Sequence, residues 1–182
     1  MTNQQLSERQ EKTLIKFAQA LIDQTAARPI ICPQKASPGF WFGGGNLLEI
    51  DGSLYLCGRY RNYGDSRVGT QTGTRGLKLA IFKSTDDGQH FEKIKSFTKQ
   101  DLEHKGLSVK SIEGAYLHWT GDEVELYVST EKEGISYPKG LESFQKPDTG
   151  VWTIDRITGP TIEDLNPKTI QEIILGEDPQ YL

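Results

Sequence analysis

The feature of this sequence that most limits its fold is a unit of antiparallel hairpins that occurs twice. In the first unit, apolar and polar residues alternate with a period of two on both sides of the Asp51-Gly52 turn, which is typical of a β-hairpin. The second unit repeats this order around Thr120-Gly-Asp122. The predicted strands cover residues 46–50, 53–59, 77–83 and 91–95 in the first unit, and 111–119, 124–130, 150–155 and 169–175 in the second.

The spacing between the two units is regular. Tyr55 and Tyr127 are 72 positions apart (127 − 55), and so are Ala80 and Trp152 (152 − 80). A fixed period with one four-stranded meander per unit is typical of β-propeller blades. We therefore expect an all-β chain in which two four-stranded antiparallel blades form part of an incomplete propeller, preceded by an N-terminal α-helix.

The expected organisation is a helical segment over 1–28, one blade over 29–108 and a second blade over 109–182. Propellers contain about four to eight blades, so two blades cannot close a ring. Their open edges would also favour self-association. We expect the chain either to be part of a longer protein, which we favour, or to complete its ring with another chain.

The single predicted helix covers residues 7–26. Ser7 and Gln10 have the spacing of a capping box, in which each side chain binds a backbone N–H group of the other residue. An apolar stripe follows at helical spacing, and Arg28-Pro29 ends the element. The stripe consists of Leu14, Phe17, Ala18, Leu21 and Ile22. We expect it to dock on the rest of the fold; the alternative is that it binds a partner.

Composition argues against several classes of partner. The net charge is −4 and like charges do not cluster, so we expect binding neither to nucleic acid nor to membranes. No apolar run of about 18 residues occurs, and no leader pattern follows Met1. Two cysteines, Cys32 and Cys57, suggest reduced thiols rather than a disulfide framework. The expected location is the cytoplasm.

The most specific short motif is Ser84-Thr-Asp-Asp-Gly-Gln-His-Phe91. It resembles the Asp-box of sialidases and other propellers. In such a turn the aspartate side chain caps the backbone, glycine supplies an unusual backbone angle and the aromatic residue packs between blades. We expect Asp86, Gly88 and Phe91 to have these structural roles, on the outer edge of the propeller.

A second motif, Ser111-Ile-Glu-Gly-Ala-Tyr-Leu117, suggests chemistry. It resembles the five-bladed propeller glycosidases of glycoside hydrolase families 32, 43, 62 and 68, in which a Glu-Gly-Pro step opens an innermost strand. The resemblance implies a five-bladed ring, a carbohydrate ligand and Glu113 as the general acid. The chain departs from that pattern at Ala115, where proline is common.

The stretch from Gly44 to Arg61 resembles the β-mannoside phosphorylase group, family 130. In that group an arginine at a strand end holds substrate hydroxyls or phosphate, which implies this role for Arg59 and Arg61. Asn46 lies in the same stretch and is a further candidate for substrate binding. Trp41 is expected either to stack on a sugar ring or to pack in the core.

A glycosidase needs two carboxylates on opposite sides of the scissile bond, one protonated and one ionised. The position matching Glu113 in the first unit, 69 residues earlier (113 − 44), is Gly44, so the second carboxylate is missing there. Asp65 is a weak candidate, with a solvated loop aspartate as the alternative. Asp51 and Asp122 are expected to form turns.

No dinucleotide or phosphate-binding glycine motif occurs, and the three histidines are 14 residues apart, so we expect neither cofactor nor metal. Two functions follow from the sequence. The first is a glycoside hydrolase whose site lies on the propeller axis. The alternative is a non-catalytic sugar-binding or scaffold propeller that lacks one carboxylate.

Overall fold

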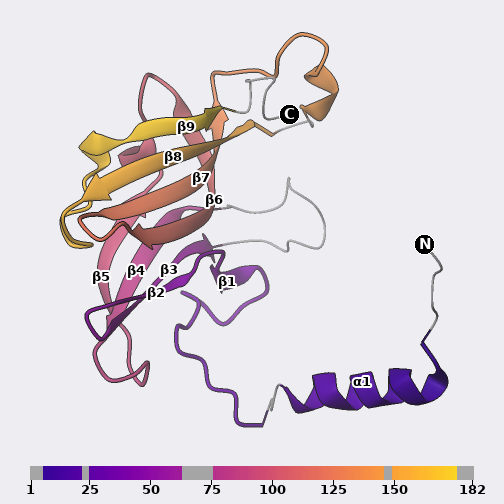
Figure 1. The fold of residues 1–182 in the computed structure, drawn as a ribbon. Coiled ribbons are helices and arrows are strands. Elements are labelled where there is room, and N and C mark those ends of the chain that lie inside the picture. The colour runs from indigo at the N-terminus through magenta and orange to yellow at the C-terminus, as the bar shows by residue number, and fades with distance from the viewer. Residues whose placement is uncertain (1–5, 22–24, 63–75, 146–148, 176–182) are drawn as a thin grey trace.

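The computed structural model describes residues 6–21, 25–62, 76–145 and 149–175. Two antiparallel sheets lie against each other, and one helix stands apart from them (Figure 1). The first sheet has the order β1-β3-β4-β5, with β2 also paired to β3, and the second has the order β6-β7-β8-β9. Their strands are β1 Phe40–Gly43, β2 Leu47–Ile50, β3 Ser53–Asn62, β4 Lys78–Ser84, β5 Glu92–Thr98, β6 Ser108–Trp119, β7 Val124–Glu133, β8 Val151–Gly159 and β9 Gln171–Leu175.

Short 3-10 helices occupy the connections: η2 Gln100–Leu102, η3 Glu142–Phe144 and η4 Pro167–Thr169. The two predicted hairpins are confirmed, since β2 pairs with β3 around Asp51-Gly52 and β6 pairs with β7 around residues 120–123. One strand was not predicted. Residues 40–43 form β1, which pairs with the far end of β3 in the register Phe40↔Asn62 to Gly43↔Arg59.

The main core lies between the two sheets. It forms because strands with a period of two present every second side chain to the same face. The buried members from the first sheet and η2 are Tyr55, Cys57, Leu79, Ile81, Phe97 and Leu102, and those from the second sheet and its β8–β9 connection are Val109, Ile112, Leu117, Val124, Leu126, Val128, Ile157, Ile162 and Leu165. Burial raises the pKa of the Cys57 thiol.

The outer face of the first sheet carries a second, smaller core. Tyr60, Ala80 and Phe82 are buried there, and Ile31, Phe42 and Phe91 pack against them. The segment before β1 thus covers part of this face. Arg28 adds a hydrogen bond from Nη2 to the carbonyl oxygen of Gly88, at 3.3 Å.

The helix α1 extends over Glu8–Ala20 and begins with the predicted capping box. The hydroxyl of Ser7 accepts from the N–H of Gln10, and the Gln10 side chain accepts from the N–H of Ser7. The prediction that its apolar stripe docks on the sheets is wrong for the described residues. Phe17 is 61% exposed, and no residue of α1 is buried. Among the described residues, no helix is long and apolar enough to cross a membrane.

Candidate functional site

The innermost strands of both sheets are interrupted by a β-bulge. In the first sheet, Gly43 pairs with Arg59 and Leu47 with Leu56, so that residues 44–46 stand opposite only residues 57–58. The strands β1 and β2 are therefore two halves of one inner strand. A bulge of this kind adds one residue to a strand and redirects the side chains near it.

In the second sheet β6 carries two such irregularities, one at Lys110 and one at Glu113, and the second lies beside Arg59. The register of β6 against β7 shifts between Ile112↔Thr130 and Gly114↔Ser129, and Glu113 falls between these two pairs. Ile112 is fully buried and Ala115 packs against the same core. Because the bulge lets these two residues share the core face, the side chain of Glu113 leaves that face. The predicted equivalence of Gly44 and Glu113 corresponds to these two bulges.

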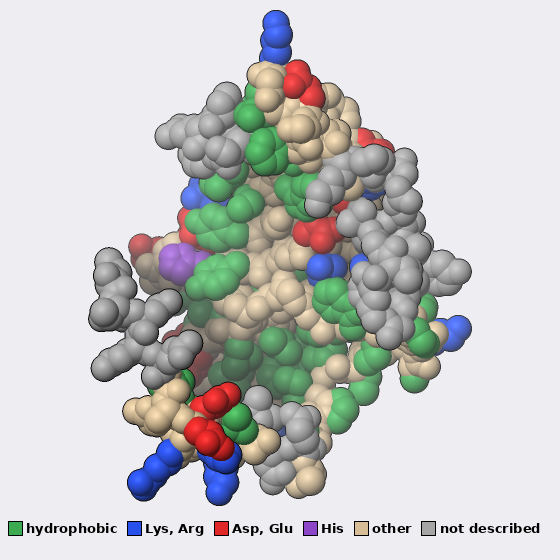
Figure 2. Space-filling model, turned by 90° about the vertical axis from the view of Figure 1, so that its right-hand side faces the viewer, with side chains coloured by type: hydrophobic (Ala, Val, Ile, Leu, Met, Phe, Trp, Pro, Cys, Tyr) green, Lys and Arg blue, Asp and Glu red, His purple; other side chains and the backbone are tan. Residues whose placement is uncertain are grey.

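The Glu113 side chain meets Arg59 from the other sheet. Arg59 Nη2 lies 3.4 Å from Glu113 Oε2, and Arg59 Nε donates a hydrogen bond to the backbone carbonyl oxygen of Glu113. The two side chains are 12% and 21% exposed, respectively, so the pair is largely buried and open to solvent on one side. On the face shown in Figure 2, acidic and basic side chains meet near the centre, bordered by hydrophobic ones.

Trp41 completes this group. Its ring centroid lies 4.6 Å from the guanidinium carbon of Arg59, which is within the range of a cation–π contact. Trp41 and Gly43 are two positions apart on β1 and therefore face the same side of the sheet. A Cβ at residue 43 would lie 3.5 Å from the Trp41 ring, in ordinary van der Waals contact with it. We call Trp41, Arg59 and Glu113 the inner-strand cluster.

The other candidates occupy different positions. Arg61 is buried, at 6% exposure, and lies opposite Trp41 in the β1–β3 register. Asn46 points toward β6, where its side-chain amide binds the backbone of Leu117. Asp65 lies outside the described residues. The structure thus brings Trp41, Arg59 and Glu113 together and places Asn46 at the seam between the sheets.

Position 44 faces the cluster without contributing a carboxylate. A side chain on Gly44 would start 3.3 Å from Arg59 Nε and 3.5 Å from the Glu113 carbonyl oxygen. Gly44 has φ +73°, a conformation that favours glycine. Among the residues that the structure describes, Glu113 is the one carboxylate ion-paired with Arg59.

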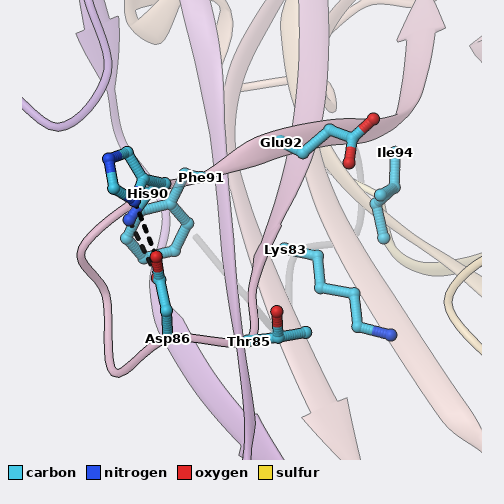
Figure 3. A pocket seen from close by; sticks show the side chains of 7 residues that line it. All are labelled: Lys83, Thr85, Asp86, His90, Phe91, Glu92 and Ile94. Carbon is cyan, nitrogen blue, oxygen red and sulfur yellow. Dashed lines mark hydrogen bonds and ion pairs between the residues drawn. The ribbon is translucent and has the colours of Figure 1, made fainter.

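Asp86 caps the turn between β4 and β5 (Figure 3). Asp86 Oδ1 accepts a hydrogen bond from the His90 backbone N–H, at 2.9 Å. It also accepts one from the Ser84 hydroxyl, at 2.8 Å. Asp86 Oδ2 lies 2.7 Å from His90 Nδ1, and these bonds hold the pKa of Asp86 well below its usual range. Gly88 has φ +78°, and Phe91 packs on the outer core of the first sheet. The shallow groove here, about 250 Å³, is separate from the inner-strand cluster.

Sequence reasoning missed a buried ion pair elsewhere in the second sheet. Lys132 Nζ lies 2.6 Å from Asp155 Oδ2, and both side chains are 0% exposed. His104 Nε2 lies 3.5 Å from the other carboxylate oxygen. The alternation of buried and exposed residues could have revealed this pair. Lys132 and Asp155 both fall on the buried positions of β7 and β8.

The outer face of the second sheet carries a polar network around Glu125. This carboxylate accepts hydrogen bonds from His118 Nδ1 at 3.0 Å, the Tyr127 hydroxyl at 2.9 Å and Arg156 Nη1 at 2.9 Å. The His118 bond is the largest cause of the lowered pKa of Glu125, and the bond to Glu125 raises the pKa of Tyr127. Among the described residues, no group of three or more His, Cys, Asp or Glu side chains is arranged to hold a metal ion.

Comparison with known proteins places the fold. No protein-family model matches the sequence, and no curated protein matches it. Among solved structures, a GH43_1 enzyme from Xanthomonas citri complexed with xylotriose superposes with a TM-score of 0.51 at 12% identity, covering 81% of this chain and 36% of that one.

A second similar structure is CoXyl43, a GH43 β-xylosidase/α-arabinofuranosidase from a compost microbial metagenome, in complex with xylotriose. It has a TM-score of 0.50 at 8% identity and covers 84% of this chain and 39% of that one. The chain therefore spans less than two-fifths of the length of either enzyme. At these identities the likeness concerns the fold alone, and it fits two antiparallel sheets that form part of a β-propeller.

Proposed function

We propose that the protein is a carbohydrate-active propeller of the glycoside hydrolase type, with its sugar site at the inner-strand cluster. The observation that supports this most is the pair of bulges, which brings an aromatic ring, a guanidinium and a carboxylate from three strands to one partly open place. Aromatic faces stack on sugar rings, while charged groups bind sugar hydroxyls. The likeness to two enzymes that were crystallised with xylotriose supports a carbohydrate as the ligand.

In this proposal Glu113 protonates the oxygen of the leaving group, Arg59 and Arg61 orient the sugar, and Trp41 stacks on it. A second carboxylate must then lie about 5–10 Å from Glu113. Asp65 remains the candidate for it. A five-bladed ring, an Asp-box over residues 84–91 and self-association through open blade edges belong to the same proposal. So does the cytoplasm, a reducing compartment that suits the two free thiols Cys32 and Cys57.

The test uses the full chain and a panel of aryl-glycosides, with xylotriose as the first binding probe. Glu113→Gln removes the proton while keeping the shape, and loss of a general acid typically lowers turnover about 10²–10⁴-fold. Glu49→Gln is the matched control, because Glu49 is an exposed residue on β2. Equal turnover by Glu113→Gln and the wild type would remove Glu113 as the acid.

A second function, sugar binding without hydrolysis, is favoured by the Arg59–Glu113 contact. A carboxylate that is already held by a guanidinium is placed to accept hydrogen bonds from sugar hydroxyls. In that case calorimetry detects xylotriose binding that Glu113→Gln weakens, while no aryl-glycoside is cleaved by any variant. Turnover by the wild type that depends on Glu113 would exclude this alternative.

A further inference from the structure

We infer that Asn46 is a positioning residue: its side chain acts as a short substitute strand that holds β6, and through β6 the bulge that carries Glu113. This inference rests on the proposed function and gives Asn46 a role different from the direct substrate binding that the sequence suggested. It depends on contacts made by the Asn46 amide, on the open edge of β6 and on the neighbouring bulges.

The Asn46 amide satisfies both backbone groups of one residue on the other sheet. Its Oδ1 accepts from the Leu117 N–H at 2.8 Å, and its Nδ2 donates to the Leu117 carbonyl oxygen at 3.0 Å. The Cys57 thiol donates to the same Oδ1, at 3.1 Å. This fixes the orientation of the amide, because the flipped form would place its NH₂ group against two donors.

These contacts matter because β6 is an edge strand. On one side it pairs with β7, and its other edge presents the N–H and C=O groups of every second residue. A strand edge buried without partners costs free energy at each unpaired group. Here the first sheet supplies the partners through isolated groups instead of through a strand.

Contacts on this edge recur at every second residue from Glu113 to Leu117, and the neighbouring Ile112 N–H also donates to the Gly76 carbonyl oxygen, at 2.9 Å. Arg59 Nε donates to the Glu113 carbonyl oxygen, the Gly44 carbonyl oxygen accepts from the Ala115 N–H at 2.9 Å, and Asn46 holds Leu117. The spacing of two positions is that of a ladder. Gly44 and Asn46 both belong to the bulge of the first sheet. The contacts along the β6 edge therefore connect that bulge to the one at Glu113.

Glu113 depends on this seam more than an ordinary strand residue does. It falls in the register shift between β6 and β7, where the regular pairing of the sheet is interrupted. Its place relative to Arg59 and Trp41 is set by the lateral contacts along the β6 edge. Of these, Asn46 makes the one that uses a side chain to bind both backbone groups of a residue.

The test is Asn46→Ala in the full chain, compared with Leu165→Ala. Leu165 is a buried core residue just beyond the end of β8, so that variant lowers stability without touching the seam. Hydrogen exchange is followed by NMR at the Leu117 and Ala115 amides and at Arg59 Nε–H, at a temperature where both variants are folded. For Asn46→Ala we expect exchange at these three sites to accelerate at least about tenfold relative to the rest of β6 and β7.

Cys57→Ser keeps a donor to Asn46 Oδ1 and is expected to leave exchange at the seam unchanged. Exchange that accelerates equally over the whole sheet in Asn46→Ala and in Leu165→Ala would reduce Asn46 to an ordinary structural residue and overturn the inference. Xylotriose binding is measured in parallel, and we expect Asn46→Ala to weaken it about tenfold. The inference is also overturned if Asn46→Ala binds xylotriose as tightly as the wild type while hydrogen exchange along the β6 edge is accelerated. A wild type that neither binds nor cleaves sugars, with the seam behaving as expected, would instead refute the proposed function.

Discussion

Replacing Lys132 by methionine should cost much of the stability of this fold. Lys132 and Asp155 form an ion pair of 2.6 Å with both side chains at 0% exposure. Methionine keeps most of the volume and removes the charge, which leaves the Asp155 carboxylate buried with the Thr130 hydroxyl at 3.5 Å and His104 Nε2 at 3.5 Å. Breaking a buried pair by removing one partner typically costs about 3–5 kcal/mol.

For a chain of this size, about 2–4 °C of melting temperature is lost for each kcal/mol, so Lys132→Met should melt roughly 6–20 °C below the wild type. Urea unfolding followed by circular dichroism gives the free energy directly. The matched control is Lys12→Met, because Lys12 and Glu8 are also 2.6 Å apart but are 70% and 81% exposed. A pair that exposed should contribute less than about 1 kcal/mol.

The double variant Lys132→Met/Asp155→Leu separates charge from packing. Replacing both members of a buried pair by apolar residues is often neutral, so the double variant should recover most of the loss. If Lys132→Met and Lys12→Met shift the urea midpoint equally, or if the double variant is as unstable as the single one, burial of the pair does not control its energy and the reasoning fails.

Three further predictions concern the bulge, the β4–β5 turn and the thiols. Gly45→Ala should lower the free energy of unfolding by more than about 3 kcal/mol, because a Cβ there would lie 2.0 Å from the Cys57 carbonyl oxygen. The control is Gly52→Ala, which has open space around it and φ +73°. Urea unfolding should give a loss of only about 1–2 kcal/mol for this control. The pKa of Asp86 is lowered in the fold, so its stabilising contribution is complete above the unfolded value of about 3.9 and disappears as the pH falls. The stability difference between the wild type and Asp86→Asn should therefore shrink between about pH 5 and pH 2, and a difference that grows on acidification would contradict this. Finally, a thiol reagent at pH 8 should modify the exposed Cys32 in the native protein. The buried Cys57, whose pKa is raised, should react only after denaturant is added. Rapid modification of the native Cys32→Ser variant would contradict this, because Cys57 is its remaining cysteine.

The hairpins and their repeat were predictable because they depend on local patterns. Alternating side chains and the Asp51-Gly52 turn determine a register within a few residues of each other, and the 69-residue offset follows from comparing two such local patterns. Glu113 and Arg59 were chosen from short motifs, and the structure places them in contact.

The contacts between distant segments could not be obtained in this way. The strand β1 pairs with β3 across a bulge, and residues 40–43, Phe-Trp-Phe-Gly, are as suitable for a core as for a strand. The amide of Asn46 binds a residue 71 positions later, which no local pattern encodes. The helix was predicted correctly as an element, but its stripe indicates only that it needs an apolar partner, without saying where that partner lies.

The two bulges have a consequence for how such a site changes over time. The inner strand is interrupted at residue 44 in one unit and at residue 113 in the other, although the two residues differ. One unit carries glycine at this position and the other carries glutamate, yet both retain the same interruption of the inner strand. The two units therefore share the interruption while the group placed at it differs, and a side chain can be gained at residue 44 only against the left-handed backbone there.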